Sequence, residues 1–334
     1  MEMFGYPIGI QLFNRPEYAE KLLVSLKQQK LKADQEKLSI FVDGFPGSVY
    51  ESRGLADKST EVKKLASYYF PKANVIGWER NIGIAALHVE LQKSIFSTGS
   101  EWGAFFEEDV VLEPAYLDEL SKLIEIVHDF QQIGKVACFQ ILPSLSHLPR
   151  GYDGFYPGRG TKAFAERKKL FDKKLPMLEE FVNIIGKPDL NHPSIDKDSL
   201  KIATFASRNF LGQLIPTMDH DIATDFFLRF NDFLHIVSRP YLATDIGFQG
   251  VHNSVTPKIT VPQTTSSANE SESRILSFRK SIDLITQESE VYAVLSYKKI
   301  MDGYYISQST KKMLKQILQN AFRRVKMLLN PVKS

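Results

Sequence analysis

The sequence predicts an α/β fold built on a parallel, doubly wound sheet, and two observations support this prediction. Short apolar runs alternate with segments of helical periodicity over residues 7–141, as in consecutive β-α units. Each of the first four apolar runs is followed by polar residues, and open α/β sheets bind ligands beyond the carboxyl ends of their strands. The composition, 43% hydrophobic and 24% charged, is that of an ordinary globular protein.

The first half of the chain has the clearer pattern. Strands are expected at 7–13, 38–42, 73–77, 102–106 and 135–141, and apolar residues recur at helical spacing in 17–29, 61–69, 81–95 and 116–130. In the second half, helices are expected at 162–186, 201–214 and 221–234, a strand at 236–243, an ordered loop at 150–160 and a mobile polar loop at 262–275.

Four polar groups directly follow predicted strands, and a parallel sheet would place all of them on one rim. They are Asn14-Arg15, Asp43-Gly44, Arg80-Asn81 and Glu107-Glu108-Asp109. The last group is the most informative, because three adjacent carboxylates repel one another unless a cation neutralises them. A divalent metal suits such hard oxygen ligands, and a solvated acidic turn is the alternative. Side chains alternate along a strand, so Glu107 and Asp109 share a face if the extended geometry continues.

Composition also restricts the class of protein. Cys138 is the only cysteine, which excludes an internal disulfide and a cysteine-based metal site and favours a reducing cytoplasm. No apolar run approaches about 18 residues, and the N-terminus shows no secretory signal. Residues 306–334 carry seven basic residues and no acidic one, so the rest of the chain sums to −4 although the whole is +3. The main body therefore has no general affinity for nucleic acid.

The motifs together resemble glycosyltransferases of the GT-A fold, most closely bacterial family-2-like members. The residues that carry the resemblance are Phe13-Asn14-Arg15-Pro16, Asp43-Gly44, Asn81-Ile82-Gly83, Glu107-Glu108-Asp109 with Pro114, and Asp245-Ile246-Gly247-Phe248 with His252. They span roughly residues 7–255. The chain departs from the family pattern twice, with Glu at the centre of the acidic motif and with Asp245 where the family has Asn.

The resemblance implies a Rossmann-like, doubly wound mixed sheet with a helical C-terminal extension. The domain would cover 1–255, with a nucleotide-sugar half (1–145) and an acceptor half (146–255), followed by a polar loop and helical extension (256–305) and a basic amphipathic helix (306–334). Mn²⁺ or Mg²⁺ would be held by Asp109, Glu107 and His252. The residues expected to contact the donor, with Glu107 in both roles, are Phe13, Asn14, Arg15, Asp43, Gly44, Arg80, Asn81, Gly83, Glu107, Glu108, Arg159 and Lys162.

The same resemblance implies transfer of a sugar from a nucleotide diphosphate to a hydroxyl, with inversion at the anomeric carbon. Asp221 is the first candidate for the base and Asp219 the second, although either could simply cap the helix that follows. The acceptor is expected to be a glycan or lipid-linked glycan of bacterial surface polysaccharide synthesis. Residues 306–334 would either lie on an anionic membrane, at the inner face of the plasma membrane, or dock on protein. The alternatives are a catalytically degenerate GT-A protein and a sugar-1-phosphate nucleotidyltransferase.

Overall fold

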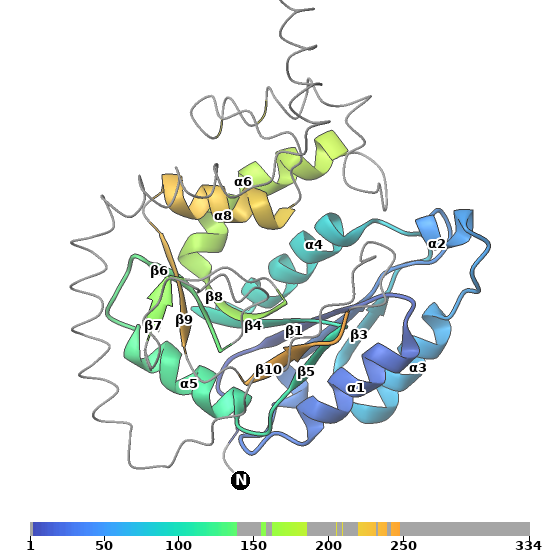
Figure 1. Cartoon of the computed structure of the whole chain (residues 1–334), viewed down its shortest axis with the longest axis horizontal. Helices are drawn as coiled ribbons and strands as arrows, with labels where there is room; N and C mark the ends of the chain where they lie inside the picture. Colours follow the sequence, from blue (N-terminus) through green and yellow to red (C-terminus); the bar gives the residue numbers. More distant parts are fainter. Residues whose placement is uncertain are drawn as a thin grey trace, which may run out of the picture. The chain divides into compact units, whose positions relative to one another are not determined.

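The central feature of the fold is an eight-stranded mixed sheet with the strand order β3-β2-β1-β4-β8-β6-β9-β7 (Figure 1). It belongs to a computed structural model that describes residues 3–138, 155–157, 162–185, 205, 209, 220–231, 233–238 and 242–247. All of these residues fall in one compact unit, Met1–Ile282. The α/β class predicted from the sequence is confirmed.

The elements follow in chain order. The strands are β1 (Ile8–Leu12), β2 (Leu38–Val42), β3 (Asn74–Gly77), β4 (Trp102–Glu107), β5 (Val110–Leu112), β6 (Ile133–Ala137), β7 (Phe155–Pro157), β8 (Ala163–Arg167), β9 (Leu234–Ser238) and β10 (Ala243–Asp245). The helices are α1 (Pro16–Lys27), α2 (Val49–Ser52), α3 (Ser59–Tyr69), α4 (Ile84–Phe96), α5 (Tyr116–Ile126), α6 (Lys168–Ile185) and α8 (His220–Phe230), with a 3-10 turn η1 (Gln35–Lys37).

The sheet is parallel where the sequence is most regular and mixed elsewhere. β3, β2, β1 and β4 pair in parallel, as the alternating pattern predicts. β8 is antiparallel both to β4 and to β6, and β7 is antiparallel to β9. The parallel sheet expected from the strand–helix alternation is therefore only part of the arrangement, which matches the mixed sheet implied by the family resemblance.

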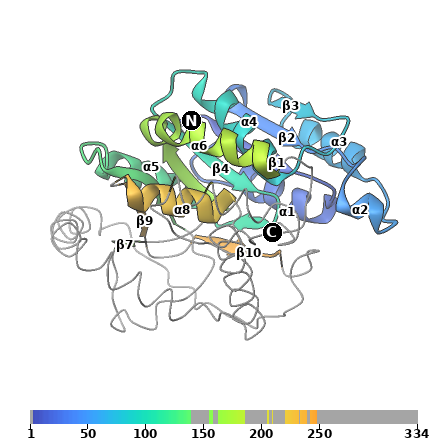
Figure 2. The same ribbon diagram turned by 90° about the horizontal axis from the view of Figure 1, so that it is seen from above.

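Helices cover both faces of the sheet. Leu23 of α1, Val62 of α3 and Leu120 of α5 belong to one buried core with strand residues. Leu91 of α4 and Phe171 of α6 belong to a second core on the opposite face. Figures 1 and 2 show α4, α6 and α8 on that second face, away from α1, α3 and α5. Apolar burial on both faces explains why the central strands are almost continuously apolar.

Four expectations for the second half of the chain are wrong in part. The loop expected at 150–160 contains β7, and the helix expected at 221–234 ends at Phe230 because Leu234 begins β9. Two further differences follow from strand pairing. The helix expected from residue 162 begins only at Lys168, because Ala163–Arg167 pairs with β4 and β6 as a strand. The strand expected at 236–243 is two short strands, β9 in the main sheet and β10 in a separate two-stranded sheet with β5. In both places pairing with distant strands overrides the local pattern.

A buried ion pair joins β8 to α6. Lys174 Nζ donates to Glu166 Oε2 at 2.7 Å, and both side chains are almost inaccessible to solvent. Gln92 of α4 donates to the other carboxylate oxygen at 3.2 Å. Burial lowers the pKa of Lys174, and the Glu166 carboxylate opposes that effect. Removal of either partner would leave a buried charge uncompensated, so the pair fixes how α6 sits on β8.

Several expectations lie outside the described residues. They include the basic helix at 306–334, the loop at 262–275, most of the helix at 201–214 and the domain boundaries after residue 247. Within the described part of the chain, no helix has the length and apolar character needed to cross a membrane.

The buried imidazole of His235 on β9 should make the fold sensitive to mild acid. Burial lowers the pKa of His235 well below its usual value, with a smaller contribution from Lys135. The folded protein therefore resists protonation that the unfolded chain accepts below about pH 6.5, so stability is lost as the pH falls through that value.

We expect His235→Leu to show a smaller loss of unfolding free energy than wild type between about pH 7.5 and about pH 5. Urea unfolding at the two pH values measures the difference. His128→Leu, which removes an exposed histidine, is the matched control for the loss of an imidazole. If wild type and His235→Leu lost the same unfolding free energy between the two pH values, buried His235 would not be the cause of the acid sensitivity.

Candidate functional site

The carboxyl ends of the parallel strands bring the four predicted polar groups into direct contact as two pairs. Arg15 Nε, just after β1, donates to Glu108 Oε1, just after β4. The backbone N–H of Phe13 donates to the other oxygen of Glu108 at 2.9 Å. After β2, Asp43 accepts from the side chain of Asn81 at 2.9 Å. The adjacency predicted from the strand ends is thus seen in the structure.

Asp43 anchors the segment that leads into α4. Its carboxylate is buried and accepts backbone N–H bonds from Gly44, Ile82 and Gly83 at 2.8, 2.8 and 3.0 Å, besides the bond from Asn81. Gly83 has a φ of 83°, a left-handed conformation that favours glycine. A Cβ on Gly44 would come within 2.3 Å of the Arg80 carbonyl carbon, so the two predicted groups pack backbone to backbone.

The remaining residues of the first motif also have structural partners. Asn14 donates to the Ala56 carbonyl at 2.9 Å and accepts from the Lys58 N–H at 2.6 Å. The ring of Phe13 packs edge-on against Tyr50, with ring centroids 5.1 Å apart. These contacts organise the loop around the site, and roles toward a ligand remain predictions.

The acidic motif does not stay extended. β4 ends at Glu107, and Glu108 and Asp109 form a turn before β5. The two side chains that would share a face in an extended strand therefore meet different partners. Glu107 lies near α8, whereas Asp109 contacts Arg15 and Lys162.

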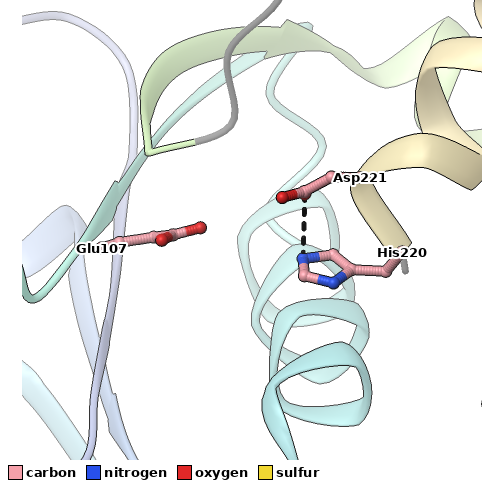
Figure 3. A group of neighbouring side chains, drawn as sticks. All are labelled: Glu107, His220 and Asp221. Atoms are coloured by element: carbon pink, nitrogen blue, oxygen red, sulfur yellow. Dashed lines mark ion pairs between the residues drawn. The ribbon is translucent and has the colours of Figure 1, made fainter. Parts of the chain in front are cut away.

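Glu107, His220 and Asp221 form a group that could hold a metal ion (Figure 3). One ligand atom from each residue lies within 4.8 Å of the others, and His220 Nε2 is 3.1 Å from Asp221 Oδ1. Figure 3 shows the Glu107 and Asp221 carboxylates directed toward each other from β4 and α8. Among the described residues, the buried His220 Nε2 has no hydrogen bond of good geometry. The two carboxylates suit Mn²⁺ or Mg²⁺, and the imidazole is a further candidate ligand.

A second charged cluster surrounds Asp109. Lys162 Nζ lies 3.1 Å from Asp109 Oδ2 and 2.9 Å from Asp245 Oδ2, and Arg15 Nη2 lies 3.4 Å from the same Asp109 oxygen. Burial alone would lower the pKa of Lys162, but the carboxylates of Asp109, Glu107 and Asp245 raise it above its ordinary value. The ammonium is therefore held charged in this cluster.

Negative charge exceeds positive charge among the described residues of the site. Five carboxylates face two cations; the acids are Glu107, Glu108, Asp109, Asp221 and Asp245, and the cations are Arg15 and Lys162. The pKa of Glu107 is raised well above its usual value, first by burial and then by the Asp221 and Asp109 charges. An added cation would relieve this repulsion.

Buried polar side chains lie beside the group formed by Glu107, His220 and Asp221. His88 of α4 is 3.2 Å from Gln11 Oε1 of β1, and its ring centroid is 5.3 Å from that of His220. Burial lowers the pKa of His88 well below its ordinary value, and the neighbouring His220 adds to this effect. A neutral His88 can pack against His220 without charge repulsion.

Sequence reasoning missed two residues of the site, and three predicted ones lie outside the described residues. No sequence pattern distinguishes His220, which directly precedes the candidate base Asp221, and Asp245 stands out only as part of a motif. Pairing of β10 with β5 brings Asp245 to the acidic turn, where Ile246 donates to the Asp109 carbonyl at 2.8 Å. The predicted residues that are not described are Arg159, Asp219 and His252.

We expect Asp43→Ala to cost about 3 kcal/mol of unfolding free energy, because several buried N–H donors would lose their acceptor. Urea denaturation measures the change. Asp34→Ala, which removes an acceptor of one hydrogen bond at the exposed turn η1, is the matched control and should cost about 1 kcal/mol or less. A loss for Asp43→Ala no larger than that of the control would show that Asp43 does not anchor the segment.

Comparison with known proteins gives weak likenesses only. No protein-family model and no curated protein matches the chain. A solved structure of the mannosyltransferase PcManGT from Pyrobaculum calidifontis, in complex with GDP-Man and Mn²⁺, matches with 12% identity and a TM-score of 0.35, covering 70% of this chain and 73% of that one. S. aureus TarS 1-349, in complex with UDP-GlcNAc, matches with 11% identity and a TM-score of 0.34, covering 50% of this chain and 47% of that one. Scores this low carry no argument, so function has to rest on the residues of the site.

Proposed function

We propose that this protein is a glycosyltransferase of the GT-A type that transfers a sugar from a nucleotide diphosphate to a hydroxyl group. The observation that carries the proposal is the meeting of Glu107 with His220 and Asp221 at the carboxyl end of β4. Arg15 and Lys162 lie at the same rim and carry the charges that a diphosphate requires. The order of the sequence motifs supports the same conclusion.

The residues present fit a divalent metal. The excess of carboxylates, the raised pKa of Glu107 and the lack of a hydrogen bond to His220 Nε2 within the described residues all favour a cation between β4 and α8. In this proposal Glu107 and His220 hold Mn²⁺ or Mg²⁺, which when bound would neutralise charge on the departing diphosphate. The family resemblance adds Asp109 and His252 as candidate ligands.

Asp221 is the proposed catalytic base. Its side chain is 35% exposed at the first turn of α8, so an acceptor could reach it. The carboxylate would take the proton of the acceptor hydroxyl while that oxygen attacks the anomeric carbon from the side opposite the diphosphate, which inverts the configuration. Asp219 is the second candidate by sequence.

The donor would approach over the polar ends of β1, β2 and β4. Phe13, Asn14, Asp43, Gly44, Arg80, Asn81 and Gly83 shape this part of the rim, and Glu108 fixes Arg15 within it. The acceptor is proposed to be a glycan or lipid-linked glycan of surface polysaccharide synthesis. Cytoplasmic location and membrane contact through 306–334 belong to the same proposal; the single cysteine supports the first, and the basic residues of 306–334 support the second.

The first test is a thermal-shift series with UDP, GDP, CMP and dTDP, each with and without Mn²⁺. We expect one nucleotide to raise the melting temperature only when Mn²⁺ is present, since a ligand at 100 times its Kd adds about 2.7 kcal/mol to stability. Glu107→Gln should abolish the shift. The matched control Glu36→Gln changes an exposed glutamate of η1 and should keep it. The absence of any shift in folded wild-type protein would favour a catalytically degenerate protein.

Asp221→Asn separates a base from a metal ligand. We expect the variant to keep the Mn²⁺-dependent nucleotide shift and to lose about 10²- to 10⁴-fold in sugar transfer, because proton transfer alone is removed. Transfer is followed with the nucleotide selected by the thermal series, supplied as its sugar conjugate. Loss of the nucleotide shift itself would assign Asp221 to the metal instead.

A further inference from the structure

Lys162 occupies an unusual position between two carboxylates. Its ammonium lies 3.1 Å from Asp109 Oδ2 and within 3.0 Å of both oxygens of Asp245. The side chains of Lys162, Asp109 and Asp245 are only 15%, 10% and 18% exposed. Three oxygens from two acids thus surround one positive charge, an oxygen environment that also suits a hard metal ion.

The backbone fixes this arrangement from three sides. The Glu107 N–H donates to the Lys162 carbonyl at 2.8 Å, which continues the β4–β8 ladder to the rim. The Ile246 N–H donates to the Asp109 carbonyl at 2.8 Å, and the Gly247 N–H donates to Asp245 Oδ1 at 2.8 Å. A Cβ on Gly247 would lie 2.2 Å from Asp109 Oδ2, so the absence of a side chain lets the carboxylates approach closely.

Within the described part of the chain, one oxygen of the cluster has no hydrogen-bond partner. Asp109 is 7% exposed, and its Oδ1 is buried without a hydrogen-bond partner among the described residues, although Oδ2 contacts both Lys162 and Arg15. A single ammonium does not satisfy both oxygens of this carboxylate. A divalent ion could bind both, provided that Lys162 were absent.

We propose that Lys162 is a tethered cation that takes the place of a divalent metal between Asp109 and Asp245. The protein then has two cation positions at the end of β4. The Lys162 ammonium fills the first position, and the second, at Glu107 and His220 beside Asp221, is open to a metal ion. Delivery of the Lys162 charge to a donor diphosphate rests on the proposed function, whereas the exchange of ammonium for metal does not.

The proposal predicts that removal of the ammonium creates a metal site. The measurement is Mn²⁺ binding, followed by the electron paramagnetic resonance signal of free Mn²⁺, in a Glu107→Gln/Asp221→Asn background that silences the other position. We expect Lys162→Met in this background to bind Mn²⁺ at least tenfold more tightly than the background itself and to show a Mn²⁺-dependent rise in melting temperature.

Two controls locate the gained ion. Lys162→Arg keeps a positive charge and should gain no Mn²⁺ binding. Addition of Asp245→Asn to Lys162→Met removes one of the two acids and should abolish the gain. If Lys162→Met does not fold without metal, Lys162→Gln is measured in its place, with folding checked by circular dichroism.

Three results would overturn the proposal. The first is that a folded Lys162→Met or Lys162→Gln protein gains no Mn²⁺ binding. The second is that the background protein with Lys162 binds Mn²⁺ equally tightly. The third is that the gain in Mn²⁺ binding persists after Asp245→Asn is added. None of these measurements depends on sugar transfer, so the proposal can fail while the proposed function stands, and the reverse is also possible.

Discussion

Repulsion among carboxylates at the end of β4 is the constraint around which the site is built. Five acids converge there. The turn after Glu107 directs the three acids of the motif to different partners. Glu108 is neutralised by Arg15 and a backbone N–H, and Asp109 by Lys162 and Arg15. Glu107 alone faces α8 with another acid beside it. The excess charge is thereby concentrated at one position, where a cation gains most from binding.

The antiparallel strand β8 makes this distribution possible. In a sheet that was parallel throughout, only the residues after each strand would reach the rim. β8 runs the other way, so the residue that precedes it, Lys162, lies beside the end of β4. The Lys162 side chain therefore reaches the rim from a backbone that is hydrogen-bonded to the sheet. This backbone positions the Lys162 charge more firmly than a free loop would.

The predictable part of the structure is the part governed by local pattern. β1 to β4 and the helices between them follow from apolar runs and helical periodicity, and the adjacency of Arg15 to Glu108 and of Asp43 to Asn81 follows from parallel strand ends. The sequence pattern does not predict β8, because Ala163–Arg167 lacks β-branched residues. The segment becomes a strand by pairing with β4 and β6. His220 and Asp245 were missed for a related reason, since only the tertiary fold carries α8 and β10 to the acidic turn.

The ion pairs at the two ends of β8 have a consequence for how this strand aligns with its neighbours. Lys162 binds Asp109 and Asp245 at one end of the strand, and Glu166 binds Lys174 near the other. A slip of one residue along β4 would turn Phe164 and Glu166 toward the opposite face and separate both sets of charges at once. A sheet with a shifted β4–β8 register would therefore contain buried charges without partners. These charges disfavour the shifted register relative to the native one.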